Sequence, residues 1–169
     1  MMIPVLYLVI PCYNEEAVLP ETTKELLQKY ETLIQLQKIS PESKIVFVND
    51  GSKDTTWQLI QQYHNDYPEI FSGICLAHNS GHQNAILAGM LTVKDLCDAV
   101  ITMDADLQDD INTIDKMVDE FAKGFQVVYG VRSARKTDTF FKRVTAEGFY
   151  KLMQMMGVEL VYNHADFRL

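Results

Sequence analysis

Short, continuously apolar segments alternate with stretches of helical periodicity along most of the chain. Continuous apolar runs are typical of strands that are buried on both faces, and the helical stretches between them are typical of crossover connections. This order predicts an α/β fold, a mostly parallel sheet flanked by helices on both faces. The expected strands are residues 5–10, ended by Pro11, then 44–48, 70–77, 98–103 and 125–129. The expected helices are residues 21–36, 57–67, 84–93, 111–122 and 140–156.

The composition limits the domain count and the class of partner. A chain of 169 residues is long enough for one domain with a substantial core. Its net charge of −8 argues against a general nucleic-acid binder. The stretch from Gly130 to Leu169 is basic on balance, which fits either an anion-binding surface or an exposed basic helix face.

Cysteine usage and apolar run length predict the compartment. Cys12, Cys75 and Cys97 have irregular spacings, which predicts reduced, small core residues in a cytosolic environment. The sequence contains neither a signal-peptide pattern nor an apolar run of membrane-spanning length. We therefore expect this chain to be soluble and cytoplasmic.

Polar clusters follow each of the expected strands. Ligands of such sheets bind outside the carboxyl ends of the strands, so these clusters are expected to form one site. The clusters are residues 11–16, 49–54, 78–84, 104–110 and 132–136.

The most informative cluster is the Asp104-Ala105-Asp106 sequence. In an extended stretch the two carboxylates share one side of the chain and could face one hard cation such as Mg²⁺ or Mn²⁺. No His or Cys lies beside them, which argues against zinc. The alternative is a solvated acidic loop that caps the helix beginning near Asp110.

The second cluster predicts a tight turn. Gly51 can adopt positive φ and so let a ligand approach the backbone, while Asp50 can accept hydrogen bonds from a base or a ribose. Either Ser52 or Asp54 is expected to cap the following helix, which leaves Asp50 available for a ligand.

Three more clusters contribute candidates. Tyr13 either stacks on a base or covers the sheet edge, and Glu16 is expected to favour the positive end of the first helix. The segment from Gly81 to Asn84 opens the third helix, whose free N–H groups can hold phosphate. Within that segment His82 is expected to be polar lining rather than a catalytic base. The cations Arg132, Arg135 and Lys136 are candidate donors to phosphate oxygens.

Several of these segments resemble the signature blocks of family 2 glycosyltransferases, which have the Rossmann-like GT-A fold. The resemblance covers essentially the whole chain, and its later blocks are similar to the polyprenyl-phosphate glycosyltransferases, such as dolichol-phosphate mannose synthase and bacterial undecaprenyl-phosphate glucosyltransferases. The blocks are residues 9–16, 48–55, 78–85, 103–108, 129–132 and 166–169.

The resemblance implies a UDP- or GDP-sugar donor, Mg²⁺ or Mn²⁺, and a polyprenyl phosphate acceptor. It implies that Asp104 and Asp106 address the ribose and the metal diphosphate, with Gln108 as a further metal ligand. Asp106 and Asp166 are the expected catalytic carboxylates. The expected donor-binding residues are Pro11, Tyr13, Glu15, Asp50, Gly81, Asn84, Asp104, Ala105 and Arg132.

Relatives continue beyond the position of Leu169 through acceptor-site segments and, in many, transmembrane helices. The resemblance therefore predicts that residues 1–169 are a single catalytic domain, truncated before those segments, and that the full-length protein works at the cytoplasmic face of a membrane. Asp109-Asp110 stands where many relatives have a nearby proline, so the loop after Gln108 departs from the family pattern.

Other functions remain open at this point. One is a family 2 glycosyltransferase that uses a hydroxyl acceptor and hence needs a true general base. Others are a regulator or fragment that binds the donor without transfer, a sugar-phosphate nucleotidyltransferase, and a phospho-receiver module. The nucleotidyltransferase would carry a Gly-rich basic N-terminal loop and the receiver a Lys after the fifth strand, and the sequence has neither.

Overall fold

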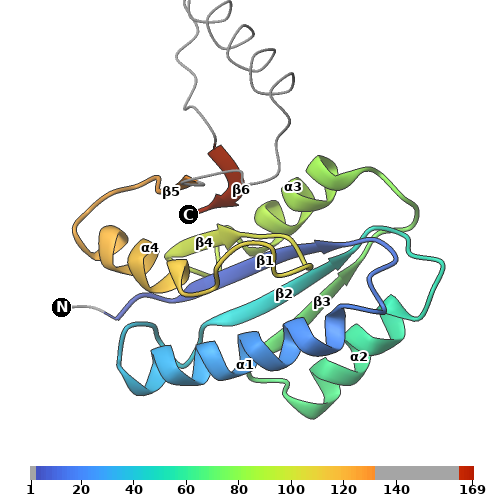
Figure 1. The fold of residues 1–169 in the computed structure, drawn as a ribbon, viewed down its shortest axis with the longest axis horizontal. Coiled ribbons are helices and arrows are strands. Elements are labelled where there is room, and N and C mark those ends of the chain that lie inside the picture. Colours follow the sequence, from blue (N-terminus) through green and yellow to red (C-terminus); the bar gives the residue numbers. More distant parts are fainter. Residues whose placement is uncertain (1–2, 132–163) are drawn as a thin grey trace, which may run out of the picture. The chain divides into compact units, whose positions relative to one another are not determined.

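The computed structural model describes residues 3–131 and 164–169. Strands and helices alternate as the sequence predicts (Figure 1). The strands are β1 (Leu6–Cys12), β2 (Lys44–Asn49), β3 (Phe71–Cys75), β4 (Ala99–Thr102), β5 (Tyr129–Val131) and β6 (His164–Arg168). The helices are α1 (Leu19–Gln35), α2 (Thr56–Asp66), α3 (His82–Val93) and α4 (Thr113–Ala122).

The sheet is mostly parallel, which confirms the predicted fold class. Its strands lie in the order β3-β2-β1-β4-β6, and the first four run parallel. β6 pairs with β4 in the antiparallel direction, with Arg168 opposite Thr102. The carboxyl ends of β1, β2, β3 and β4 therefore share one edge, and the polar clusters that follow them meet there.

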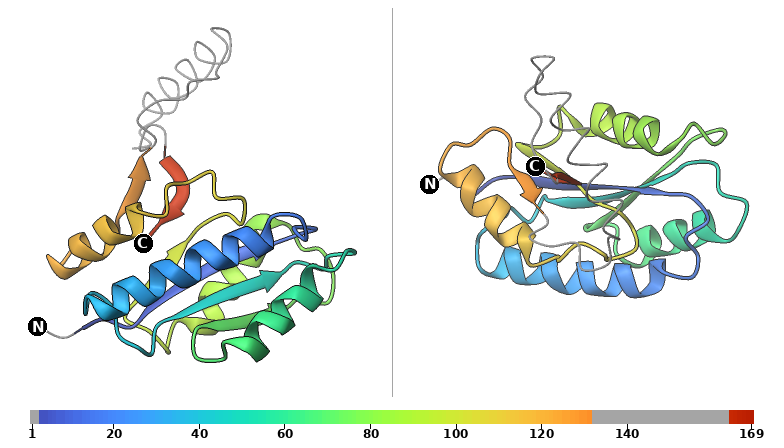
Figure 2. Two further views of the ribbon diagram at one scale, coloured as in Figure 1. Left: turned by 60° about the horizontal axis from the view of Figure 1, so that its bottom comes forward. Right: turned by 45° about the horizontal axis from the view of Figure 1, so that its top comes forward.

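Helices cover both faces of the sheet. α3 lies on one face, and α1, α2 and α4 lie on the other (Figure 2). α3 approaches the sheet closely because Gly89 has no side chain. A Cβ atom at that position would lie 2.5 Å from Val9 Cγ1 and 2.9 Å from Val48 Cγ2. The core beneath α3 consists of Tyr7, Val9, Val46, Val48, Ala85 and Val93.

Pro11 does not end the first strand, contrary to the sequence prediction. β1 continues through Cys12, whose carbonyl accepts the Asp50 N–H on the β2 side. Because successive residues of a strand bond to opposite sides, Pro11 faces the β4 side. There the last bond runs from Met103 N to Val9 O, and the pairing with β4 ends at that point because Pro11 has no N–H to donate.

Two further predictions about the chain are corrected. The fifth strand begins at Tyr129 rather than Phe125, because the Phe125 N–H still bonds to Glu120 O at the end of α4. The three cysteines are free, but only Cys12 is buried, while Cys75 is exposed. The predicted helix at 140–156 lies outside the described residues.

The chain divides into two compact units, residues 1–128 with 166–169, and residues 129–165. The first unit contains the four parallel strands and α1 to α4. Of the second, residues 129–131 and 164–165 are described. Within the described parts of the chain, every helix is too short or too polar to cross a bilayer.

Candidate active site

A cavity of about 320 Å³ lies at the carboxyl-terminal edge of the sheet, where β1 and β2 end. It brings together residues from three of the polar clusters. Five residues that the sequence predicts as donor-binding line it, namely Pro11, Tyr13, Glu15, Asp50 and Gly81. Cys12, Asn79 and His82 complete the wall.

Asp50 is held by the backbone of the segment before α3. It is buried, with 3% of its surface exposed, and its two carboxylate oxygens accept the N–H groups of Ser80 at 2.6 Å and Gly81 at 3.0 Å. These bonds satisfy a buried charge and fix the loop that forms one wall of the cavity. Each oxygen keeps a second lone pair with which a ligand can bond.

Gly51 has the predicted positive φ, at +66°. Its backbone is approached closely, but by the chain itself. A Cβ atom at Gly51 would lie 2.5 Å from the Asn79 nitrogen and 2.6 Å from the His78 carbonyl carbon. The glycine therefore lets the segment before α3 pack against the turn after β2.

Hydrogen bonds join the loop after β1 to the loop after β2. Asn14 adopts a φ of 56°, its N–H donates to Ser52 Oγ at 3.0 Å, and its Oδ1 accepts the Lys53 N–H at 2.8 Å. The Glu15 N–H donates to Thr56 Oγ1 at 2.8 Å. Tyr13 and Glu15 thus lie in the cavity on a loop whose shape is fixed by hydrogen bonds to the residues that follow β2.

Glu16 has a different role from the predicted one. Its Oε2 accepts the Thr55 N–H at 3.0 Å and the Thr55 hydroxyl at 2.6 Å, so its charge lies at the start of α2 rather than α1. The prediction that Ser52 or Asp54 caps this helix is wrong, because the N-cap residue of α2 is Thr55; Asp54 precedes it and accepts the Thr56 N–H at 3.0 Å. Both carboxylates lie at the N-terminal end of α2, where the helix dipole stabilises negative charge.

Glu15 lies in an electrostatically unfavourable position. Burial raises the pKa of its carboxyl, and the neighbouring charges of Asp106, Asp54 and Asp104 raise it further. For Asp54, burial also acts to raise the pKa, but hydrogen bonds from Thr56 and the Glu16 N–H outweigh it and lower the pKa. Negative charge therefore accumulates on the side of the cavity that faces the loop after β4.

That loop carries the two carboxylates of the Asp104-Ala105-Asp106 sequence. Met103 and Ala105 are buried, whereas Asp104 is half-buried and Asp106 is exposed, so the two carboxylates point away from the core. The stretch is not extended, because Ala105 and Asp106 form a turn. Asp106 Oδ1 accepts the Gln108 N–H at 3.1 Å, and the intervening Leu107 has a φ of 54°.

His82 connects the cavity to this loop. It is the first residue of α3, and its Nε2 lies 3.6 Å from Asp104 Oδ1. This agrees with the expectation of a polar lining residue. Cys12 also lines the cavity, but burial raises the pKa of its thiol, which argues against a thiolate nucleophile.

The remaining predicted residues are placed as follows. The Asn84 amide donates to Ser80 O at 2.7 Å and so bonds to its own loop rather than lining the cavity. Ala105 is buried, and its carbonyl accepts the Thr22 hydroxyl. Asp166 is a residue of β6, whereas Arg132 lies outside the described residues. The predicted role of Gln108 as a metal ligand stays a prediction.

The sequence predictions did not include Asn14, Cys12, Asn79 and Thr22 as site residues. Asn14 and Cys12 lie inside the first polar cluster and Asn79 inside the third, so their position after a strand was an available signal. Thr22 had no such signal, because it lies in a helix and reaches the site through a bond across 83 residues of sequence.

The sequence matches known proteins along nearly its whole length. The model of glycosyl transferase family 2 matches residues 7–169. The uncharacterized glycosyltransferase YkoT of Bacillus subtilis (strain 168) is 52% identical over 166 residues, which are 98% of this chain and 49% of that protein. The bactoprenol glucosyl transferase of Shigella phage SfV is 37% identical over 164 residues, 96% of this chain and 50% of that protein. The chain thus spans about half the length of these curated relatives.

Solved structures share the fold. The mannosyltransferase PcManGT from Pyrobaculum calidifontis, in complex with GDP-Man and Mn²⁺, superposes with a TM-score of 0.61 at 18% identity, covering 90% of this chain and 39% of that one. S. aureus TarS 1-349, in complex with UDP, gives a TM-score of 0.51 at 19% identity, with 80% and 38% covered. At this identity the likeness shows the fold alone, which is GT-A. With the family match over residues 7–169, the chain belongs to glycosyl transferase family 2.

Proposed function

We propose that this chain binds a nucleoside diphosphate sugar and transfers the sugar, with inversion, to a polyprenyl phosphate. The observation that carries the proposal is the cavity that places Tyr13, Glu15 and Asp50 beside the loop with Asp104 and Asp106. The bactoprenol glucosyl transferases among the relatives support the choice of a lipid phosphate as the acceptor. Because that acceptor is a lipid, the full-length protein would work at the cytoplasmic face of a membrane.

The nucleoside would occupy the cavity. Tyr13 is 40% exposed at its rim, and its ring would stack on the base. Asp50 would accept a hydrogen bond from the base or the ribose through its remaining lone pairs. Pro11 and Glu15 would form the floor, and Gly81 would present the start of α3 to the phosphates.

The carboxylate loop fits a divalent cation. Within residues 3–131 and 164–169, no three His, Cys, Asp or Glu side chains converge on one position, so the proposed ion would take only the carboxylates of Asp104 and Asp106 from this group of residue types. Mg²⁺ and Mn²⁺ suit oxygen ligands, and Mg²⁺ sites often combine one or two carboxylates with water and substrate phosphates. Burial raises the pKa of Glu15, and the charges of Asp106, Asp54 and Asp104 raise it further, so negative charges lie close together beside the proposed ion. Asp104, Asp106 and Gln108 would hold the ion, which would neutralise charge on the departing diphosphate.

The transfer is a single displacement at the anomeric carbon. An oxygen of the acceptor phosphate forms the new bond to this carbon while the bond to the β-phosphate oxygen of the donor breaks, and the configuration inverts. A phosphate monoester with a second pKa of about 6 is largely dianionic at neutral pH, so it needs no strong general base. Asp166 would orient the sugar or stabilise positive charge on its ring, and Arg132 would bond to phosphate.

Calorimetric titration tests the donor site. UDP-glucose, UDP-GlcNAc and GDP-mannose would each be titrated into the chain with Mn²⁺ and, in parallel, with EDTA. We expect one donor to bind in the presence of metal only, and Asp106→Ala to abolish that binding. Failure of all three donors to bind to the folded chain with Mn²⁺ would contradict the proposal for this chain.

The acceptor is tested separately with the full-length protein. Transfer of labelled sugar to undecaprenyl phosphate, but not to oligosaccharide, would support the lipid phosphate acceptor. The reverse result would favour a family member that acts on a sugar hydroxyl. Donor binding without transfer to either acceptor would indicate a regulator.

A further inference from the structure

The loop from Met103 to Asn112 carries the paired carboxylates and has no helix or strand of its own. Its shape is fixed by hydrogen bonds inside the loop and by bonds to other elements. One of these bonds lies between the two carboxylates in sequence. The buried carbonyl of Ala105 accepts the hydroxyl of Thr22 from α1 at 2.5 Å.

The Thr22 hydroxyl has two acceptors within reach. Its Oγ1 lies 2.5 Å from Ala105 O and 3.0 Å from the carbonyl oxygen of Val18, the N-cap residue of α1. A hydroxyl has one proton to donate, and the shorter contact favours Ala105 O as its acceptor. Thr22 and Ala105 are 1% and 3% exposed, which leaves water little access to replace this bond.

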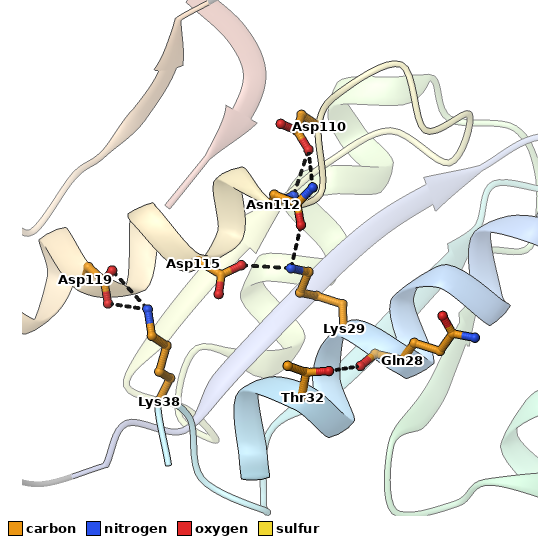
Figure 3. A network of polar contacts seen from close by, with 8 residues as sticks. All are labelled: Gln28, Lys29, Thr32, Lys38, Asp110, Asn112, Asp115 and Asp119. Atoms are coloured by element: carbon orange, nitrogen blue, oxygen red, sulfur yellow. Dashed lines mark hydrogen bonds and ion pairs between the residues drawn. The ribbon is translucent and has the colours of Figure 1, made fainter. Parts of the chain in front are cut away.

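The same helix also bonds to the far end of the loop. Lys29, two turns after Thr22, donates to Asn112 Oδ1 at 2.8 Å and to Asp115 Oδ2 at 2.9 Å, and Asp110 Oδ1 accepts from Asn112 (Figure 3). α1 begins directly at the nucleoside side of the cavity, since Glu15 O accepts the Leu19 N–H. One helix thus connects the cavity wall to both ends of the carboxylate loop.

We propose that Thr22 is a positioning residue for the metal carboxylates. Its hydroxyl holds the Ala105 carbonyl toward α1, and this fixes the backbone turn from which the side chains of Asp104 and Asp106 point away from the core. The inference rests on the proposed function, because it assigns Thr22 a task in the cation site of that function.

Two variants of Thr22 separate the hydroxyl from the shape of the side chain. Thr22→Val keeps the branched shape and removes the donor, whereas Thr22→Ser keeps the donor and removes a methyl group. Thr32→Val is the matched control, since Thr32 lies on the same helix and donates to Gln28 O one turn earlier without contacting the loop (Figure 3). Both valine variants therefore lose a hydroxyl from α1, but only one loses the bond to Ala105.

The measurement is Mn²⁺ affinity, from the electron paramagnetic resonance signal of free Mn²⁺ during titration with UDP or GDP present. We expect Thr22→Val to weaken Mn²⁺ binding about tenfold, which is typical for the loss of a hydrogen bond that orients the metal ligands. Thr22→Ser should restore binding to near the unmodified level, and Thr32→Val should leave it unchanged. Circular dichroism melts check that each variant is folded.

Three results would overturn the inference. The first is unmodified Mn²⁺ affinity in a folded Thr22→Val variant, and the second is an equal loss in Thr32→Val. If Thr22→Val does not fold, Thr22→Ala replaces it, because alanine removes the hydroxyl without placing a methyl group against the Ala105 carbonyl. Unchanged Mn²⁺ affinity in a folded Thr22→Ala variant would also overturn the inference. The third is absence of Mn²⁺ binding by the unmodified chain with either nucleotide, which would also remove the metal from the proposed function.

Discussion

Two carboxylates in the wall of the cavity are stabilised to very different degrees. Asp50 is buried, yet both of its oxygens accept backbone N–H groups, from Ser80 and Gly81. Glu15 is half-buried, and the charges of Asp106, Asp54 and Asp104 lie near it. Asp50 therefore stabilises the loop before α3, whereas the charge of Glu15 is electrostatically unfavourable in the folded chain and lies where the donor is proposed to bind.

Replacing Glu15 by Gln should make the ligand-free chain more stable at neutral pH. The folded pKa of Glu15 is raised above its ordinary value of 4.5, so the folded state binds the proton more tightly than the unfolded state does. The free energy of unfolding contributed by Glu15 therefore falls as pH rises from below 4.5 through the folded pKa. The difference in the free energy of unfolding between Glu15→Gln and the unmodified chain should therefore grow as pH rises over that interval.

Urea unfolding of both proteins across this pH range, with EDTA present, measures the difference. Glu31→Gln, an exposed position on α1, controls for the loss of one negative charge from an acidic protein. A stability advantage of Glu15→Gln that does not change with pH would contradict the assigned cause.

Gly51→Ala should open the wall of the cavity. The new Cβ would meet the backbone of His78 and Asn79 at 2.5 to 2.9 Å, in addition to the strain of a φ of +66°. We expect a loss of about 2 kcal/mol or more in the free energy of unfolding, together with loss of nucleotide binding.

Gly124→Ala is the matched control for this substitution. Gly124 also has positive φ, at +97°, but a Cβ atom there would meet nothing within 4 Å. Its cost should be about 1 kcal/mol, from backbone strain alone, and binding should be unaffected. Equal losses in the two alanine variants would show that the contact with residues 78 and 79 does not matter.

Among the elements, α1 and the turn that follows it are joined to α4 by two ion pairs of unequal burial (Figure 3). Lys29 and Asp115 have 13% and 28% of their side-chain surface exposed, whereas Lys38 and Asp119 have 30% and 53% exposed. Lys29 also bonds to Asn112. The more buried pair should therefore contribute more to stability, although its charge is also the more costly to desolvate.

We expect Lys29→Met to lower the free energy of unfolding by about 1 to 2 kcal/mol, since it leaves Asp115 and Asn112 without their cation. Lys38→Met should cost only about 0.5 kcal/mol or less, because an exposed pair is screened by solvent. Chemical denaturation at low and high salt measures both. A larger loss of unfolding free energy for Lys38→Met than for Lys29→Met would contradict the conclusion that the more buried ion pair contributes more to stability.

Periodicity predicted the strands from β1 to β5 and the helices from α1 to α4, but several of their ends did not follow from it. The end of β1 depends on β2, since β1 pairs with β2 through Cys12 although its pairing with β4 ends at Val9. The start of β5 depends on how far the end of α4 continues to bond with Phe125. β6 was not predicted at all, because a short mixed segment becomes a strand only through its remote partner Thr102.

For the whole molecule, convergence of the polar clusters was predictable from the parallel order of the strands. The individual bonds within the site were not. Glu16 bonds to Thr55, and Thr22 to Ala105, over 39 and 83 residues of sequence. Such pairs depend on how the helices pack on the sheet, and sequence periodicity gives the buried face of a helix without giving its partner across the fold.

The first compact unit should fold and bind nucleotide without residues 129–165. All four parallel strands and α1 to α4 belong to it, and its two chain segments meet where Val128 and Leu169 exchange backbone hydrogen bonds at 2.9 Å. Asp166 lies three residues before Leu169, so a gap of about 10 Å separates the ends to be joined. A flexible Gly-Ser linker of about eight residues spans that distance.

The shortened chain lacks Arg132, which is proposed to bond to phosphate. We therefore expect it to unfold cooperatively and to bind UDP or GDP with Mn²⁺ about tenfold more weakly than the whole chain, as the loss of charge-assisted hydrogen bonds would give. Arg132→Ala in the whole chain is the matched control and should show the same loss. Calorimetry compares the three proteins. A shortened chain that does not fold would show that the core needs residues 129–165, and one that binds as tightly as the whole chain would remove Arg132 from the phosphate site.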